Sequence, residues 1–163
     1  MDELFCQPDL IPNYVYAGLV FDSSRRSHLM LCLRPGPGNM GMVYTGHRVG
    51  PREPLANWGE MKRVMSRQVK IDSGVTVDPD KWVFIVGSLL PTDPPTRIMY
   101  LAATADLTKN QPKNLNPTQC TVSVEDGNYL PRNIASTVQW VIPFILDPMI
   151  PKGAQFPDEA EMR

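Results

Sequence analysis

Apolar residues along this chain follow two different spacings. In the first, β-branched and aromatic residues are concentrated in short stretches between polar or proline- and glycine-rich segments, a pattern typical of β-strands. Six stretches have this pattern: residues 14–21, 28–33, 41–45, 81–90, 97–104 and 119–124. A polar turn separates the first two, so we expect them to form a hairpin. Residues 34–39 contain two prolines and two glycines, which predicts a loop.

The second spacing, of three to four positions, is typical of an amphipathic helix and dominates residues 58–73. This segment contains no proline. Asn57, directly before it, is a good N-cap, and Glu60 three positions later completes the pattern of a capping box. Gly74, directly after it, is the residue type that commonly ends a helix.

A second helix is predicted over residues 131–146. Pro131 fits the first helical position, where its missing N–H costs nothing. Pro143 lies inside the segment, so we expect a kink or a break there. Residues 148–163 form an acidic tail with three prolines, and we expect this tail to pack poorly.

The predicted order is strand, strand, strand, helix, strand, strand, strand, helix. Mixed strands with two separated helices indicate the α/β class, arranged as an α/β/α sandwich around a mixed sheet. The chain has 163 residues and no internal repeat. We therefore expect one domain over residues 1–147, followed by the tail at 148–163.

Composition narrows the classes of function. The net charge of −1 gives no overall field for binding a polyanion. No apolar run approaches the roughly 18 residues of a membrane span, and no apolar segment typical of a secretory signal follows the acidic start. Three widely spaced cysteines without a CxxC pair predict free thiols in a reducing compartment. Together these features predict a cytoplasmic protein that does not bind membranes.

The first predicted helix ends in the run Arg67-Gln68-Val69-Lys70-Ile71-Asp72-Ser73-Gly74-Val75. This run resembles the end of the Nudix box, REUXEEXGU, in which U is a bulky aliphatic residue. The matching positions are Gly46, for the opening glycine of the box, and Arg67, Val69, Asp72, Gly74 and Val75. Glu53 resembles the loop glutamate, but thirteen residues separate it from Arg67 where the family has seven. The order of elements over residues 14–147 is also similar to the Nudix fold.

The resemblance implies a hydrolase that cleaves a nucleoside diphosphate linked to another moiety, either a nucleotide or a nucleotide sugar. Family members bind Mg²⁺ or Mn²⁺ through closely spaced glutamates, because such cations take oxygen ligands and neutralise the diphosphate. Three of these glutamate positions hold Gln68, Ile71 and Asp72 here. Gln68 keeps an oxygen without the charge, and Ile71 keeps neither. The implied metal ligands are therefore Asp72, Gln68 and Glu53, in a weakened site.

The catalytic residues that the resemblance implies are Asp72, Glu53, Glu60 and Arg67. Each also has a structural interpretation as a surface charge, and Glu60 has one as the capping-box partner of Asn57. An acid near a helix C-terminus is unfavourable to the helix dipole. The presence of Asp72 at that position therefore favours a functional role.

Four residues are candidates for binding the ligand: Gly46, His47, Arg48 and Arg34. His47 could contact a phosphate or act as a base, because imidazole transfers protons near neutral pH. Arg34 and Arg48 could each donate paired hydrogen bonds to a phosphate.

More than one function is compatible with the altered box. The GDP-mannose hydrolase branch of this family also replaces the first two glutamates after the arginine, keeps the last acidic residue and is active, so the altered box is compatible with an active enzyme. The alternative is a catalytically inactive Nudix-fold module that binds a nucleotide or RNA, and the net charge makes RNA the less favoured ligand. A third interpretation is an interaction scaffold that uses residues 148–163. Many family members dimerise, so a homodimer is also compatible.

Overall fold

The computed structural model describes residues 13–25, 28–36, 39–50, 52–55, 57–91, 93–115, 120–124 and 136–146. In chain order, their elements are β1 (Asn13–Asp22), β2 (Leu29–Gly36), β3 (Asn39–Val43), β4 (Thr45–Arg48), α2 (Trp58–Ser73), the 3₁₀ helix η2 (Pro79–Lys81), β5 (Val83–Leu90), β6 (Thr96–Ala105), β7 (Cys120–Val124) and α3 (Ser136–Leu146). Neither α2 nor α3 is long and apolar enough to cross a membrane.

The described strands form one seven-stranded mixed sheet in the order β3-β2-β1-β6-β5, with β4 also paired to β1 and β7 also paired to β2. β1 lies at the centre of this sheet, and its whole length pairs in parallel with β6. Its other edge is divided between two strands. Val20 and Phe21 pair with β2, whereas the stretch from Val15 to Gly18 pairs with β4. This division leaves β4 beside α2, which it contacts.

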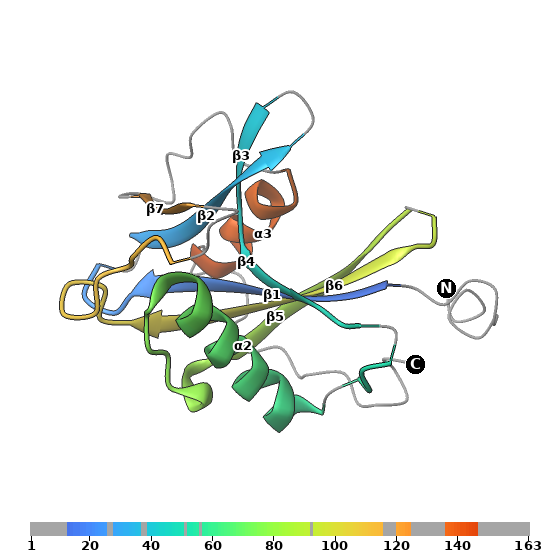
Figure 1. Cartoon of the computed structure of the whole chain (residues 1–163), viewed down its shortest axis with the longest axis horizontal. Coiled ribbons are helices and arrows are strands. Elements are labelled where there is room, and N and C mark those ends of the chain that lie inside the picture. Colours follow the sequence, from blue (N-terminus) through green and yellow to red (C-terminus); the bar gives the residue numbers. More distant parts are fainter. Residues whose placement is uncertain are drawn as a thin grey trace.

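α2 and α3 cover opposite faces of the sheet (Figure 1). Alternate side chains of a strand point to opposite faces. Tyr16 and Val20 of β1 accordingly lie in the apolar cluster under α2, whereas Ala17 and Leu19 lie in the cluster under α3. The helix residues that complete the two clusters are Met61, Val64, Met65 and Val69 of α2, and Val138, Val141 and Ile142 of α3. The prediction of an α/β/α sandwich around a mixed sheet is confirmed.

α2 has the bounds and the caps that the sequence predicts. The side chain of Asn57 accepts a hydrogen bond from the Glu60 N–H at 2.8 Å. At the other end, Gly74 adopts a left-handed conformation with φ of 74°, and its N–H donates to the Lys70 carbonyl. A side chain at such a φ would be strained, so glycine is the residue that ends the helix without cost.

The loop predicted over residues 34–39 is wrong in part, because β2 continues to Gly36 and β3 begins at Asn39. β7 pairs with β2 only as far as Leu33. Beyond that residue β2 has β3 as its described neighbour, with Pro35 opposite Met40. A proline is tolerated where one edge of a strand needs no N–H donor, which explains why the pairing continues.

The single strand predicted over residues 41–45 is two strands with different partners. β3 pairs with β2 up to Val43, and β4 pairs with β1 from Thr45 onward. Tyr44, which lies between them, belongs to neither strand. The change of partner is a tertiary effect that a local pattern of apolar residues does not reveal.

The second predicted helix corresponds to α3, which continues through Pro143 to Leu146. Of the two expected effects of Pro143, the break is therefore wrong, and the kink stays a prediction. The predicted helix start at residues 131–135 and the tail at 148–163 lie outside the described residues.

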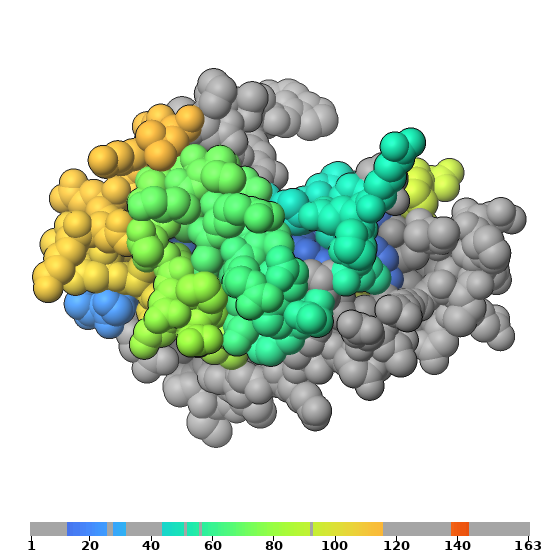
Figure 2. Space-filling view, turned by 60° about the horizontal axis from the view of Figure 1, so that its bottom comes forward, coloured from blue at the N-terminus to red at the C-terminus, as the bar shows by residue number. Residues whose placement is uncertain are grey.

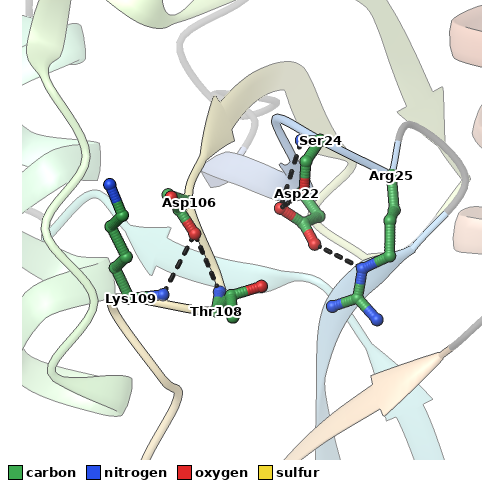
Figure 3. Close-up of polar contacts among 6 residues, drawn as sticks. All are labelled: Asp22, Ser24, Arg25, Asp106, Thr108 and Lys109. Atoms are coloured by element: carbon green, nitrogen blue, oxygen red, sulfur yellow. Dashed lines mark hydrogen bonds and ion pairs between the residues drawn. The ribbon is translucent and has the colours of Figure 1, made fainter.

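Parallel pairing brings the ends of β1 and β6 together at one end of the sheet, where each strand continues into a turn that an aspartate stabilises (Figure 3). Asp22, which is fully buried, accepts hydrogen bonds from Ser24 and forms an ion pair of 2.7 Å with Arg25. Asp106 accepts from the N–H groups of Thr108 and Lys109, both at 3.0 Å. These contacts fix the turns on the α2 side of the molecule.

Candidate active site

The C-terminal half of α2 carries the residues that correspond to the box glutamates. Asp72 is 2% exposed and faces the sheet together with Met61 and Met65. Gln68, one helical turn earlier, donates from Nε2 to Asp72 Oδ2 at 3.1 Å. Ile71 instead points outward and is 57% exposed. Helical geometry thus separates the three positions into an inward polar pair and an outward aliphatic side chain.

β4 and the segment after it carry a second polar group. His47 Nε2 lies 3.0 Å and 3.1 Å from the two carboxylate oxygens of Glu53. The Gly50 N–H donates to the same carboxylate at 2.9 Å. The imidazole ring also stacks on Tyr16, with 5.9 Å between the ring centroids. The carboxylate and the tyrosine together fix the position of the imidazole.

Glu53 is held as an anion by its surroundings. Burial raises the pKa of this carboxyl, but the hydrogen bonds from Gly50 and His47 and the positive charges of His47 and Arg67 outweigh that effect and lower the pKa below its usual value. Arg67 belongs to α2 and Glu53 to the segment after β4. The charge of Arg67 therefore acts on Glu53 from the neighbouring helix.

A hollow in the molecular surface separates these two groups (Figure 2). One wall is α2, drawn in green, and the other is β4 with the residues after it, drawn in teal. Part of β1 is visible between them in blue. α2 carries Gln68 and Asp72, whereas β4 and the residues after it carry His47 and Glu53, so the hollow lies between the elements that carry the two polar groups.

Glu60 does not join the site. It lies twelve positions before Asp72 on the same helix, a rise of about 18 Å at 1.5 Å per residue. Its carboxylate is exposed and forms an ion pair of 2.6 Å with Arg63, while its N–H is bonded to Asn57. Glu60, a predicted catalytic residue, thus lies far from Asp72, and its contacts fit the structural alternative of helix capping.

The other ligand-binding candidates have different positions. Gly46 lies in β4 opposite Ala17 of β1. Arg48 lies opposite Val15, whose side chain belongs to the cluster under α3. Because successive side chains of a strand point to opposite faces, the Arg48 side chain leaves the sheet on the face opposite to that of His47. The predicted contact of Arg48 with a phosphate stays a prediction. Arg34 is part of β2, but its side chain lies outside the described part of the chain.

The oxygens of the site suit a divalent cation only in part. Asp72 supplies a carboxylate and Gln68 an amide oxygen, whereas His47 and Gly50 already bind the third candidate, Glu53. No group of three or more His, Cys, Asp or Glu among the described residues could hold a metal ion. Mg²⁺ is, however, commonly bound by one or two protein oxygens together with water and the phosphates of a substrate. Asp72 and Gln68 fit that kind of site.

The sequence named both His47 and Glu53 as candidates but not their contact with each other. Gly50 lies midway between them, and its N–H bonds the carboxylate of Glu53, while the Glu53 N–H bonds the Gly50 carbonyl at 3.0 Å. A glycine midway between a histidine and a glutamate is a weak indication of such a turn.

Solved structures with a similar arrangement of elements include a Nudix hydrolase. The chain is similar to the MutT Nudix hydrolase from Burkholderia pseudomallei, with a TM-score of 0.62 and 13% identity over 82% of this chain and 98% of that chain. For a MutT from a study of Aliivibrio salmonicida and Vibrio cholerae, the TM-score is 0.55 and the identity 20%, over 80% and 97% of the two chains. For the ORF135 protein of E. coli, they are 0.55 and 13%, over 80% and 85%.

No protein-family model and no curated protein sequence matches the chain. At these low identities the structural similarity concerns the fold, and the fold of this chain is the Nudix fold.

Proposed function

We propose that the protein is a Nudix-type hydrolase that cleaves a nucleoside diphosphate linked to another moiety, either a nucleotide or a nucleotide sugar. The observation that carries this proposal is the presence of two polar pairs on the α2 side of the sheet. Gln68 and Asp72 form one pair on the helix. His47 of β4 and Glu53, in the segment after β4, form the other.

Asp72 and Gln68 would hold Mg²⁺ or Mn²⁺ together with the phosphates of the substrate. A divalent cation held by Asp72 and Gln68 would neutralise the charge that develops on the diphosphate. Because Asp72 and Gln68 supply one carboxylate and one amide oxygen, we propose that the cation arrives with the substrate and has low affinity for the free protein.

His47 is proposed as the base that takes a proton from the attacking water. Since Nε2 lies against the carboxylate of Glu53, a neutral ring carries its proton on that nitrogen, and Nδ1 presents the lone pair. Nδ1 has no hydrogen-bond partner within the described residues. Glu53, kept ionised by Gly50 and Arg67, stabilises the ring when it becomes positive. This is how carboxylates support catalytic histidines.

The proposal is tested by comparing two aspartate substitutions. Asp72→Asn should abolish metal-dependent turnover, because it removes the buried carboxylate of the site. Asp80→Asn is the matched control: Asp80 also lies near α2, but its side chain is 88% exposed in an ion pair with Lys62. Equal turnover in both variants, at equal thermal stability, would refute the proposed role of Asp72.

A second candidate is a catalytically inactive module that binds a nucleotide. Two observations favour it: an exposed aliphatic side chain, Ile71, at one box position, and the contact of the Glu53 carboxylate with His47, which leaves this carboxylate less available to a cation. Such a module would bind a nucleotide equally well with and without chelator and would show no turnover. RNA is the less favoured ligand, because the net charge of −1 provides little attraction for a polyanion.

A further inference from the structure

Two large aliphatic side chains are exposed beside the candidate active site. Ile71 of α2 is 57% exposed, and Leu115, in the segment between β6 and β7, is 52% exposed. Single apolar residues on a surface are common and need no explanation. These two, however, come from distant parts of the chain and are held at the same end of the same helix.

Hydrogen bonds anchor the segment that carries Leu115 to the end of α2. The Lys113 N–H donates to the Ser73 carbonyl at 2.8 Å, and Asn110 Nδ2 donates to the Thr76 carbonyl at 3.0 Å. In Figure 2 this segment, drawn in gold, lies against the green surface of α2. Leu115 is thus presented by a fixed backbone.

Gly74 lets the segment that carries Leu115 approach the end of α2. Leu115 Cδ1 lies 3.3 Å from the place where a side chain at Gly74 would begin, so a side chain there would crowd Leu115. Ile71 lies three positions before Gly74, in the last turn of the same helix. We call Ile71, Gly74 and Leu115 the apolar shelf.

Positive charges flank the apolar shelf. Arg67 lies one turn before Ile71 on the same helix face and is exposed. The Cδ atom of Lys113 lies 4.0 Å from the position that a Cβ atom at Gly74 would occupy. An apolar surface between cationic side chains complements a nucleotide, whose base has apolar faces and whose phosphates are anionic. Asp72 and Gln68 lie directly beside Ile71 in the same helix.

We infer that the apolar shelf is the surface on which the base of the nucleoside diphosphate substrate packs, with Arg67 and Lys113 attracting its phosphates. This inference rests on the proposed function. It explains why an aliphatic residue occupies position 71: the side chain there contacts the base and leaves the cation to Asp72 and Gln68. The substrate is then recognised through its nucleoside and not only through its diphosphate.

The test compares two classes of probe by titration calorimetry. ADP, GDP, CDP and UDP carry a base, whereas inorganic diphosphate does not, and each is titrated in the presence of Mg²⁺. In Ile71→Ser and in Leu115→Ser, the Kd of the tightest-binding nucleoside diphosphate should rise about fivefold or more, while the Kd of inorganic diphosphate stays unchanged. Val83→Ser is the control, because Val83 is also an exposed apolar residue but lies on β5, opposite Ala102, which faces α3.

The outcomes separate this inference from the proposed function. Unchanged nucleoside diphosphate binding in both shelf variants, or an equal loss of inorganic diphosphate binding, would overturn the inference while leaving the hydrolase proposal intact. If the unmodified protein binds neither class of probe, the proposed function fails and the inference fails with it. Because both side chains are more than half exposed, the serine variants should fold, and their thermal unfolding is measured alongside.

Discussion

Glu53 binds Nε2 of His47 with both of its carboxylate oxygens, at 3.0 Å and 3.1 Å. This contact determines which ring nitrogen is available to a ligand, because the proton of a neutral imidazole then lies on Nε2. It also joins a strand end to the loop that follows it, since Glu53 is bonded to Gly50 as well. The site is therefore organised before any ligand arrives.

The first prediction concerns His47 as the base. His47→Gln keeps a polar side chain but cannot take a proton near neutral pH, so kcat should fall by about 10²- to 10⁴-fold with a small change in KM. The measurement is steady-state turnover across pH. Arg63→Gln serves as the control, because Arg63 is exposed on α2 and paired with Glu60. A kcat within twofold of the unmodified protein would rule out His47 as the base.

The second prediction concerns the outward face of α2. Ile71 is 57% exposed and points away from the pair of Gln68 and Asp72, so Ile71→Glu should fold. Its affinity for Mn²⁺ alone should stay within about twofold of that of the unmodified protein, because the new carboxylate is not directed at the cation site. Titration calorimetry with Mn²⁺ measures this, with Val83→Glu as the control for added charge. A rise of about tenfold or more over that control would mean that position 71 faces the cation site.

The third prediction concerns acid stability. Burial raises the pKa of Asp22, but hydrogen bonds from Arg25 and Ser24 and the charge of Arg25 outweigh it, so the pKa is lowered on folding. An aspartate whose pKa is lower in the folded than in the unfolded protein stabilises the fold at any pH above its unfolded pKa, which is about 3.9. This contribution is lost as the pH falls through the pKa of the folded protein. Asp22→Asn should therefore unfold more easily at neutral pH.

Denaturant unfolding between pH 3 and pH 7 measures this effect. The difference between Asp22→Asn and the unmodified protein should be largest at neutral pH, about 1–3 kcal/mol, and should shrink toward the acidic end. The exposed Asp80→Asn should show little difference at any pH. A difference that grows toward acid would show that the sign of the pKa shift is wrong.

The fourth prediction uses two glycines of the sheet. A Cβ at Gly18 would lie 2.6 Å from Met65 Cε and 2.9 Å from Trp82 Cη2. Gly18→Ala should therefore cost about 1–3 kcal/mol of folding free energy through overpacking under α2. At Gly87 the nearest atom, in Met99, lies at 3.5 Å, an ordinary contact, so Gly87→Ala should be close to neutral. Equal destabilisation in the two variants would contradict the close packing at Gly18.

Local signals in the sequence predicted α2 correctly, because its caps at Asn57 and Gly74 and its apolar spacing all lie within the helix itself. The division between β3 and β4 was missed because it depends on which strand lies beside β1 and β2 in three dimensions. The fold class followed from the order of elements. The cytoplasmic location and the homodimer stay predictions.

The candidate site was predictable by residue type but not by geometry. The spacing of the box residues placed Gln68 and Asp72 together, and the helix does bond them. The spacing did not show that Arg48 starts on the opposite sheet face from His47, which is a consequence of strand alternation from Val15 onward. The spacing also did not show that the carboxylate of Glu60 forms an ion pair with Arg63.

The central claim is that the altered site still hydrolyses a substrate with a divalent cation. The most direct measurement is a coupled assay of phosphate and sugar release over nucleoside triphosphates, dinucleotides and nucleotide sugars, run with Mg²⁺, with Mn²⁺ and with chelator. We predict turnover of one substrate class that needs the cation and disappears in Asp72→Asn. Turnover that persists in chelator, or none for any substrate with a folded sample, would contradict the claim.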